Sequence, residues 1–84
     1  MPEAEKVGEV VHYFDKIGVA IIKLDQPLKK GDSVEIRNNK GEAQNLTVDS
    51  MQVDHQDIAE AAAGQEVGVK VGEPVHEGNE VFRG

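Results

Sequence analysis

The stretch Leu28–Ile36 constrains the fold more than any other part of this sequence. Its centre, Lys30-Gly31-Asp32, favours a tight reversal, because Gly accepts a positive φ and Asp can hydrogen-bond its own backbone just downstream. Directly after the turn, Val34 and Ile36 alternate with charged neighbours, which is the period of a strand with one face in water. The sequence therefore predicts strands joined by short turns.

The rest of the chain follows the same plan. Runs rich in β-branched residues are separated by Gly, Pro, Asn and Asp, and they predict six strands at 6–14, 17–24, 34–37, 44–54, 66–71 and 80–83. Both faces of 17–24 are apolar or small, so we expect this strand to be central and covered on each side. The predicted fold is an all-β, six-stranded, closed or nearly closed barrel over residues 6–83, preceded by a flexible N-terminus at 1–5.

Two local features refine this picture. Leu46 and Val48 are apolar at even positions but Met51 and Val53 at odd ones, and a phase change of this kind predicts a β-bulge near Asp49-Ser50. Residues 57–60 have the spacing of a capping box and are followed by alanines, which predicts one short helical turn that Gly64 ends.

Composition limits the classes of function. The chain has 84 residues, no cysteine and a net charge of −7, so disulfides and thiolate metal sites are excluded. The acidic excess lies almost entirely in residues 43–84, and it disfavours strong non-specific binding to nucleic acid. No apolar run is long enough to span a membrane and no secretory signal is present, so we expect a cytoplasmic location.

Three motifs of the chain are Lys29-Lys30-Gly31-Asp32-Ser33-Val34-Glu35-Ile36, Val48-Asp49-Ser50-Met51-Gln52 and Ala61-Ala62-Ala63-Gly64-Gln65-Glu66-Val67-Gly68. In this order they resemble the second domain of translational GTPases such as elongation factor Tu. The resemblance implies a barrel of the translation-protein type.

Four further segments are Val7–Phe14, Ile17–Ala20, Ser50–Asp54 and Glu77–Val81. Through them the sequence is still more similar to the C-terminal barrel of the collagenase-like peptidase family, whose members also include tRNA-modifying proteins. In both families a larger catalytic domain accompanies the barrel, and these 84 residues contain no such domain and no phosphate-binding loop. No catalytic residue is carried over, and the resemblance implies a non-enzymatic binding module.

The residues themselves offer no strong catalytic or metal site. His12, His55 and His76 lack ligand spacing on any shared element, so we expect no metal and no cofactor. The run Asp54–Asp57 places an imidazole between carboxylates, and we interpret it as a polar loop with a helix cap. Ser33, Thr47 and Ser50 have no neighbouring base in sequence and are not expected to be nucleophiles.

Basic and aromatic residues are the candidates for partner contact. The basic ones are Lys23, Lys29, Lys30, Arg37 and Lys40, which form either a phosphate-binding or acidic-partner surface or an ordinary solvated face. Tyr13 and Phe14 are adjacent, so a strand directs them to opposite faces, one to the core and one to a partner or a base. Which of the two is exposed stays open here.

These observations rank three functions. The first is a stand-alone binding module that acts with a protein or ribonucleoprotein partner in translation or RNA metabolism. The alternatives are a direct RNA- or tRNA-binding protein that uses the basic residues around Arg37, and a detached accessory domain of a collagenase-like peptidase. An enzyme in its own right is the least favoured reading.

Overall fold

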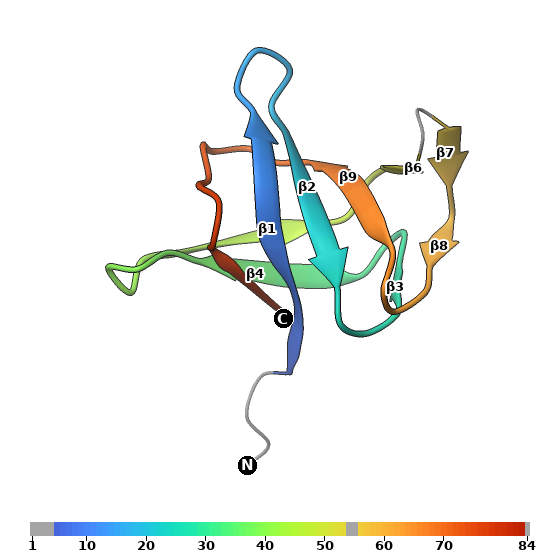
Figure 1. Cartoon of the computed structure of the whole chain (residues 1–84), viewed down its shortest axis with the longest axis horizontal. Coiled ribbons are helices and arrows are strands. Elements are labelled where there is room, and N and C mark those ends of the chain that lie inside the picture. The colour runs from blue at the N-terminus through green and yellow to red at the C-terminus, as the bar shows by residue number, and fades with distance from the viewer. Residues whose placement is uncertain (1–4, 54–55, 84) are drawn as a thin grey trace.

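The computed structural model describes residues 5–53 and 56–83, and every regular element in these ranges is a strand (Figure 1). The predicted flexible N-terminus falls, apart from Glu5, outside the described residues. In chain order the strands are β1 (Lys6–Phe14), β2 (Val19–Leu24), β3 (Leu28–Lys29), β4 (Ser33–Arg37), β5 (Ala43–Thr47), β6 (Met51–Val53), β7 (Gln56–Ile58), β8 (Glu60–Ala61), β9 (Glu66–Lys70) and β10 (Glu80–Arg83). The all-β prediction is confirmed.

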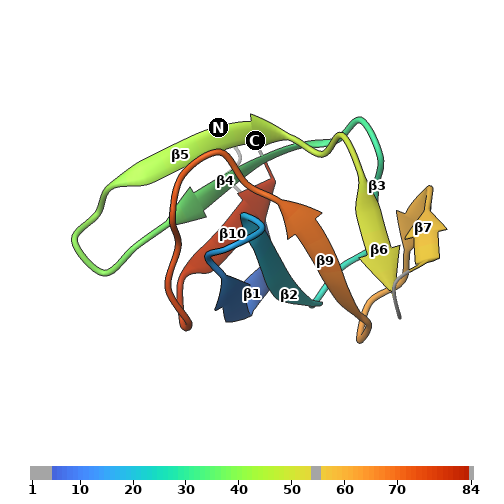
Figure 2. The same cartoon turned by 90° about the horizontal axis from the view of Figure 1, so that it is seen from above.

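Eight strands form one antiparallel sheet in the order β5-β4-β10-β1-β2-β9-β6-β7, while β3 pairs separately with β8. The sheet is curled, so β4 and β5 lie across the interior from β1, β2 and β9 (Figure 2). Strand twist produces such a curl, but the outer strands β5 and β7 do not pair with each other within the described ranges. The prediction of a six-stranded closed barrel is therefore wrong, and the molecule is an eight-stranded half-barrel.

The concave face of the sheet holds the hydrophobic core. Buried and exposed positions alternate along β2, β4 and β9, as period-two strands with one inner face require. The fully buried large side chains are Ile22, Leu24, Leu28, Met51, Val7, Val10, Val34, Val48, Val67, Val69 and Val81. The core is thus aliphatic, apart from the thioether of Met51.

Two irregularities in β1 decide which way its side chains point. The pairing register shifts between Lys6 and Gly8 against β10, and again between Val10 and His12 against β2. The second shift inserts one residue, so that Val10 and Tyr13 face the core while Phe14 faces outward. Tyr13 is half-buried and packs on the core, and Phe14 is the exposed aromatic residue of the pair.

The predicted bulge near Asp49-Ser50 is instead a break between two strands. The chain leaves β5 at Thr47 and enters β6 at Met51, and the two strands have different partners: β5 pairs with β4, and β6 pairs with β7 and β9. Val48 stays buried between them, and its amide donates to the carbonyl of Asp32 at 2.9 Å. The phase change in the sequence is real, but it marks a change of partner.

The predicted helical turn after Asp57 is also wrong. Its residues form β7 and β8, separated by a bend at Ala59. Ala61 pairs with Leu28 of β3, and Ile58 packs against the core from β7. Apolar residues three apart in sequence fit a helix and a bent strand equally well, and here pairing with β3 selects the bent strand.

Candidate functional site

The outer face of β2 differs from the prediction that this strand is covered on both sides. As predicted, β2 is central, since it lies between β1 and β9. However, only Ala20, Ile22 and Leu24 are buried, whereas Val19 and Ile21 on the opposite face are half-exposed. The expected cover on both faces is therefore absent from the described part of the chain.

Four side chains on this face form what we call the outer apolar patch: Phe14, Ile17, Val19 and Ile21. Phe14 is 44% exposed and Ile17 is 62% exposed, and they are the large hydrophobic side chains classed as exposed in residues 5–53 and 56–83. With Gln52, Glu66 and Gly68, the patch lines a shallow hollow of about 400 Å³. Contiguous exposed apolar surface rimmed by polar residues is typical of interaction sites.

Local backbone features build the patch. The turn from β1 to β2 is closed by the amides of Ile17 and Gly18, which donate to the carbonyl of Phe14 at 3.3 and 2.9 Å. Gly18 has a φ of 66°, which glycine adopts without strain. This turn places Ile17 at the hollow, and it explains why β2 begins at Val19 and not at the predicted residue 17.

Gly68 forms the floor of the hollow at the centre of β9. A Cβ atom there would lie 3.3 Å from Cγ1 of Val19 and 3.5 Å from Cδ1 of Ile21. The absence of a side chain lets these two residues of β2 lean across β9. Residues of four neighbouring strands, β1, β2, β9 and β6, thus line the hollow, and no single motif builds it.

A histidine borders the patch. The His12 ring meets the Phe14 ring edge-on, with centroids 4.4 Å apart and planes at 67°, and its Nδ1 lies 3.2 Å from Oε2 of Glu77. His76 lies in the loop before β10, where its amide donates to the side chain of Asn79, and His55 is outside the described residues. In residues 5–53 and 56–83, no group of three or more histidine and acidic side chains could hold a metal ion.

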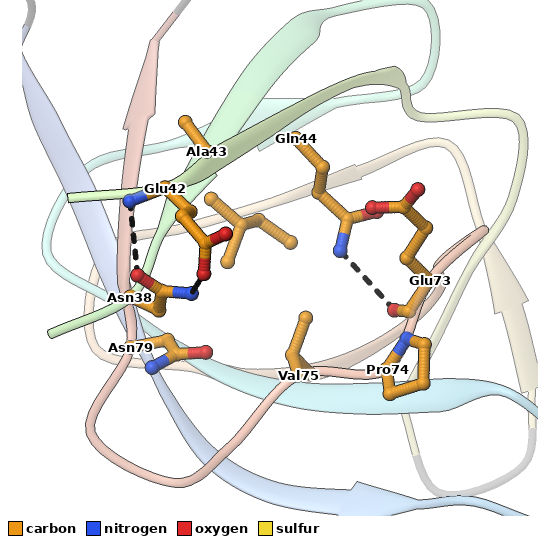
Figure 3. Close-up of a pocket in the computed structure, with 9 residues that line it drawn as sticks. Asn38, Glu42, Ala43, Gln44, Glu73, Pro74, Val75 and Asn79 are labelled. Carbon is orange, nitrogen blue, oxygen red and sulfur yellow. Dashed lines mark hydrogen bonds between the residues drawn. The ribbon is translucent and has the colours of Figure 1, made fainter. Parts of the chain in front are cut away.

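A second, polar pocket lies between the β4–β5 hairpin and the loop before β10 (Figure 3). Asn38 organises its rim, since its Oδ1 accepts from the amides of Lys40 and Glu42 and its Nδ2 donates to Oε1 of Glu42. On the opposite side Gln44 donates to the carbonyl of Glu73 at 3.1 Å. These polar groups serve the turn and the loop, and no hydroxyl or thiol is among the residues that line the pocket.

The basic residues named from sequence lie at three separate places in the fold: Lys29 and Lys30 before β4, Arg37 and Lys40 at the β4–β5 turn, and Lys23 on β2. Lys29 and Lys30 precede β4 and Arg37 ends it, so the length of this strand, about 13 Å, separates them. Lys40 lies beyond Arg37 in the β4–β5 hairpin, and Lys23 lies on β2. The structure does not bring the five residues into one compact cluster.

Each strand-borne basic residue also has an acidic neighbour. Lys23 pairs across strands with Glu9 and Glu66, and Lys29 pairs with Glu60. Arg37 forms an ion pair with Glu35 and lies 4.2 Å from the ring centroid of Phe82. These contacts weaken any positive potential at the predicted RNA surface, which stays a prediction, as does a partner contact through Tyr13.

The fold and the patch define a small all-β domain with one exposed apolar face on a curled antiparallel sheet. Its backbone matches two crystal structures of the C-terminal domain of a Geobacillus thermoleovorans protein assigned to the U32 peptidases, each with a TM-score of 0.88. One match covers 94% of this chain and 99% of that domain at 23% identity, and the other covers 95% and 92% at 22%. At this identity the likeness establishes the fold.

A sequence relative points in the same direction. The chain is 38% identical over 77 residues to an uncharacterized protease of Methanocaldococcus jannaschii. The match takes in 92% of this chain but 19% of the relative, so the chain spans about a fifth of that protein's length. No family model matches the sequence. The similarity to a peptidase C-terminal domain is confirmed, whereas the resemblance to elongation factor Tu stays a prediction.

Sequence reasoning missed the outer apolar patch, although a signal was present. Both faces of 17–24 are apolar, and this pattern predicts that each face is covered. An apolar surface left exposed for another protein produces the same pattern, and only the structure distinguishes the two, because it places Ile17 in a turn. In the described residues, the structure contains no helix with the length and apolar character needed to cross a bilayer.

Proposed function

We propose that this chain is an accessory interaction domain that works with the larger part of a U32 peptidase-like protein. The observation that carries the proposal is the match of nearly the whole chain to a segment that makes up 19% of a protease. In this relative, the segment that matches the chain is therefore joined to a much larger remainder of the protein. The fold likeness to a peptidase C-terminal domain supports the same role.

The outer apolar patch is the surface we propose for docking onto that body. Phe14 at the end of β1 and Ile17 in the β1–β2 turn expose large apolar side chains, and their burial against a second surface is favourable by about 25 cal/mol per Å². The polar rim, with Glu66 and the His12–Glu77 pair, matches the usual arrangement of an apolar centre within a polar border.

This proposal corresponds to an alternative in the ranking from sequence and not to its first choice. A partner in translation rests on motifs that are turns and core strands, which specify a fold more than a function. The RNA-binding alternative needs a concentrated basic surface, and the lysines and arginine are spread over separate elements with acidic neighbours.

A labelling experiment tests the docking. Because the chain has no cysteine, Ile17→Cys introduces a unique thiol in the patch. Its maleimide labelling rate, read by peptide mass spectrometry, is compared between the isolated chain and a chimera in which this chain replaces the matching segment of the Methanocaldococcus jannaschii protease. We expect labelling at least about tenfold slower in the chimera, because docking buries the patch.

Lys40→Cys, in the β4–β5 hairpin and away from the patch, is the matched control and should label at the same rate in both proteins. Equal rates at Ile17→Cys in the isolated chain and in a folded chimera would contradict docking through the patch.

A further inference from the structure

Strand β5 is an edge strand whose outer backbone groups can be assigned from the pairing with β4. The amide of Asn38 donates to the carbonyl of Glu42, and that of Val48 donates to the carbonyl of Asp32, both at 2.9 Å. Antiparallel pairs alternate between bonded and non-bonded positions, so Gln44 and Leu46 direct their backbone groups toward β4. The outward N–H and C=O groups belong to Ala43, Asn45 and Thr47.

Strand β5 itself carries no charge, proline or bulge that would keep this edge from pairing with another chain. Charged residues, proline, bulges or a very short strand protect the edges of β-sheets from pairing with other chains. All residues of β5 are uncharged in a sequence that is 30% charged, and its register with β4 runs without a shift from Thr47 to Ala43. The opposite edge, β7, has three residues and carries the exposed Asp57.

A row of hollows follows β5 along its length. The first is the polar pocket in Figure 3, beside Ala43 and Gln44. The next is lined by residues 43–46 together with Gly72 and Glu73, and the last by Leu46 and Thr47 together with Lys70. An extended segment laid along β5 would therefore meet a hollowed surface and not a flat one.

The charges around this edge indicate what kind of segment would bind to it. Glu42, Glu73 and Asp49 line the hollows, against a single cation, Lys70, among the same lining residues. A second copy of this chain would bring the same acidic border and a net charge of −7, so like charges would oppose self-pairing. A basic segment suits the site better.

We propose that β5 binds an extended polypeptide segment with basic flanks by strand addition, forming backbone hydrogen bonds to Ala43, Asn45 and Thr47. Main-chain bonds at a sheet edge supply the affinity in this mode of recognition, and side-chain and charge complementarity supply the specificity. The proposal is independent of docking through the outer apolar patch, since β5 and β2 are separate strands of the sheet.

The test uses a synthetic probe of alternating threonine and valine, about six residues long, with lysines at both ends. Amide exchange is followed by NMR on the full chain with and without the probe at millimolar concentration. We expect exchange at Ala43, Asn45 and Thr47 to slow at least about tenfold, with little change at Gln44 and Leu46, which already bond to β4.

Two variants separate strand addition from other modes of binding. Asn45→Pro removes an outward N–H that β4 does not use, and should abolish the protection by the probe while keeping the β4–β5 pairing. If this variant does not fold, Glu42→Lys combined with Glu73→Lys serves instead, and should weaken binding of the lysine probe at least about tenfold and favour a probe with glutamates.

Several results would overturn the proposal. The first is that the probe does not slow amide exchange at Ala43, Asn45 and Thr47 in the parent chain. The second is that exchange slows only at Phe14–Ile21. The third is that the parent chain binds the lysine and glutamate probes with equal affinity. Dimerisation of the chain through β5, detected by sedimentation without any probe, would also overturn it in favour of a second copy as the occupant.

Discussion

Arg83 in the last strand lies 3.3 Å from Asp32 in the Lys-Gly-Asp turn, measured from Nη1 to Oδ2, across 51 positions of sequence. The Asp32 carboxylate also accepts from the amide of Lys29 at 3.0 Å, and the second Arg83 nitrogen donates to the carbonyl of Pro27. The sequence predicts that this aspartate bonds its own backbone downstream. The structure shows it bonding upstream and holding the end of β10.

This relationship predicts a modest coupling energy between the two side chains. In a double-mutant cycle with Asp32→Asn and Arg83→Met, we expect about 0.5–1 kcal/mol of coupling, because the pair is partly exposed to solvent. Urea denaturation at low and high salt measures it, and the value should fall with salt. The more exposed Lys6–Glu80 pair is the comparison and should give less; equal coupling in the two pairs would contradict the prediction.

Gly8 predicts a severe effect of a single methyl group. A Cβ on Gly8 would lie 2.4 Å from the carbonyl oxygen of Lys23 and 2.9 Å from Cγ2 of Ile22, so β1 and β2 would have to move apart. We expect Gly8→Ala to lower the free energy of unfolding by about 2 kcal/mol or more. Gly72→Ala, where nothing lies within 4 Å, should change stability by less than about 0.5 kcal/mol. Similar denaturation midpoints for the Gly8→Ala and Gly72→Ala variants would contradict the close approach of β1 and β2.

Two neighbouring isoleucines of β2 test which face of the sheet is the core. Ile22 is fully buried, so Ile22→Ala should cost about 2–5 kcal/mol through lost burial and a cavity. Ile21 is half-exposed in the outer apolar patch, so Ile21→Ala should cost about 1 kcal/mol or less. Thermal or urea unfolding of both variants decides the matter. A larger loss for Ile21 than for Ile22 would mean that the outer face is the packed one.

The separation of the basic residues predicts that they do not act together on RNA. Charge reversal of Lys29, Lys40 and Arg37 to glutamate should leave tRNA binding unchanged within about threefold, because Lys29 lies away from the β4–β5 hairpin and both Lys29 and Arg37 have acidic neighbours. Binding is measured by fluorescence anisotropy over a range of salt concentrations. A steep loss of affinity together with a smaller salt slope would instead restore the RNA-binding alternative.

Much of the strand plan was predictable, because alternation and turn residues act locally. The runs at 6–14 and 80–83 are strands with the predicted bounds, and 34–37 and 66–71 differ by one residue at one end. The residues Asn38–Gly41, rich in Asn and Gly, form the turn between two of the predicted strands, with Gly41 at a φ of 83°. The core residues Val34, Ile36, Val67 and Val69 follow from period two alone.

The failures share one physical cause, which is that pairing partners are chosen over long distances in sequence. Residues 57–61 form strands because they pair with β3 and β6. The phase change at 48–50 marks a break because β5 and β6 pair with different strands. The prediction of barrel closure is wrong for the same reason, since the order of partners leaves β5 and β7 at opposite edges of the sheet within the described residues.

The sequence by itself determined an all-β domain, the positions of most strands and turns, and the resemblance to a peptidase C-terminal barrel. Only the tertiary structure decided that Tyr13 packs inward and Phe14 outward, since the register shift between Val10 and His12 is set by pairing with β2. It alone decided that the second face of β2 is exposed among the residues described and that β5 forms an edge of the sheet. Local periodicity tells which side chains share a face, but what covers that face depends on the neighbours that the whole chain supplies.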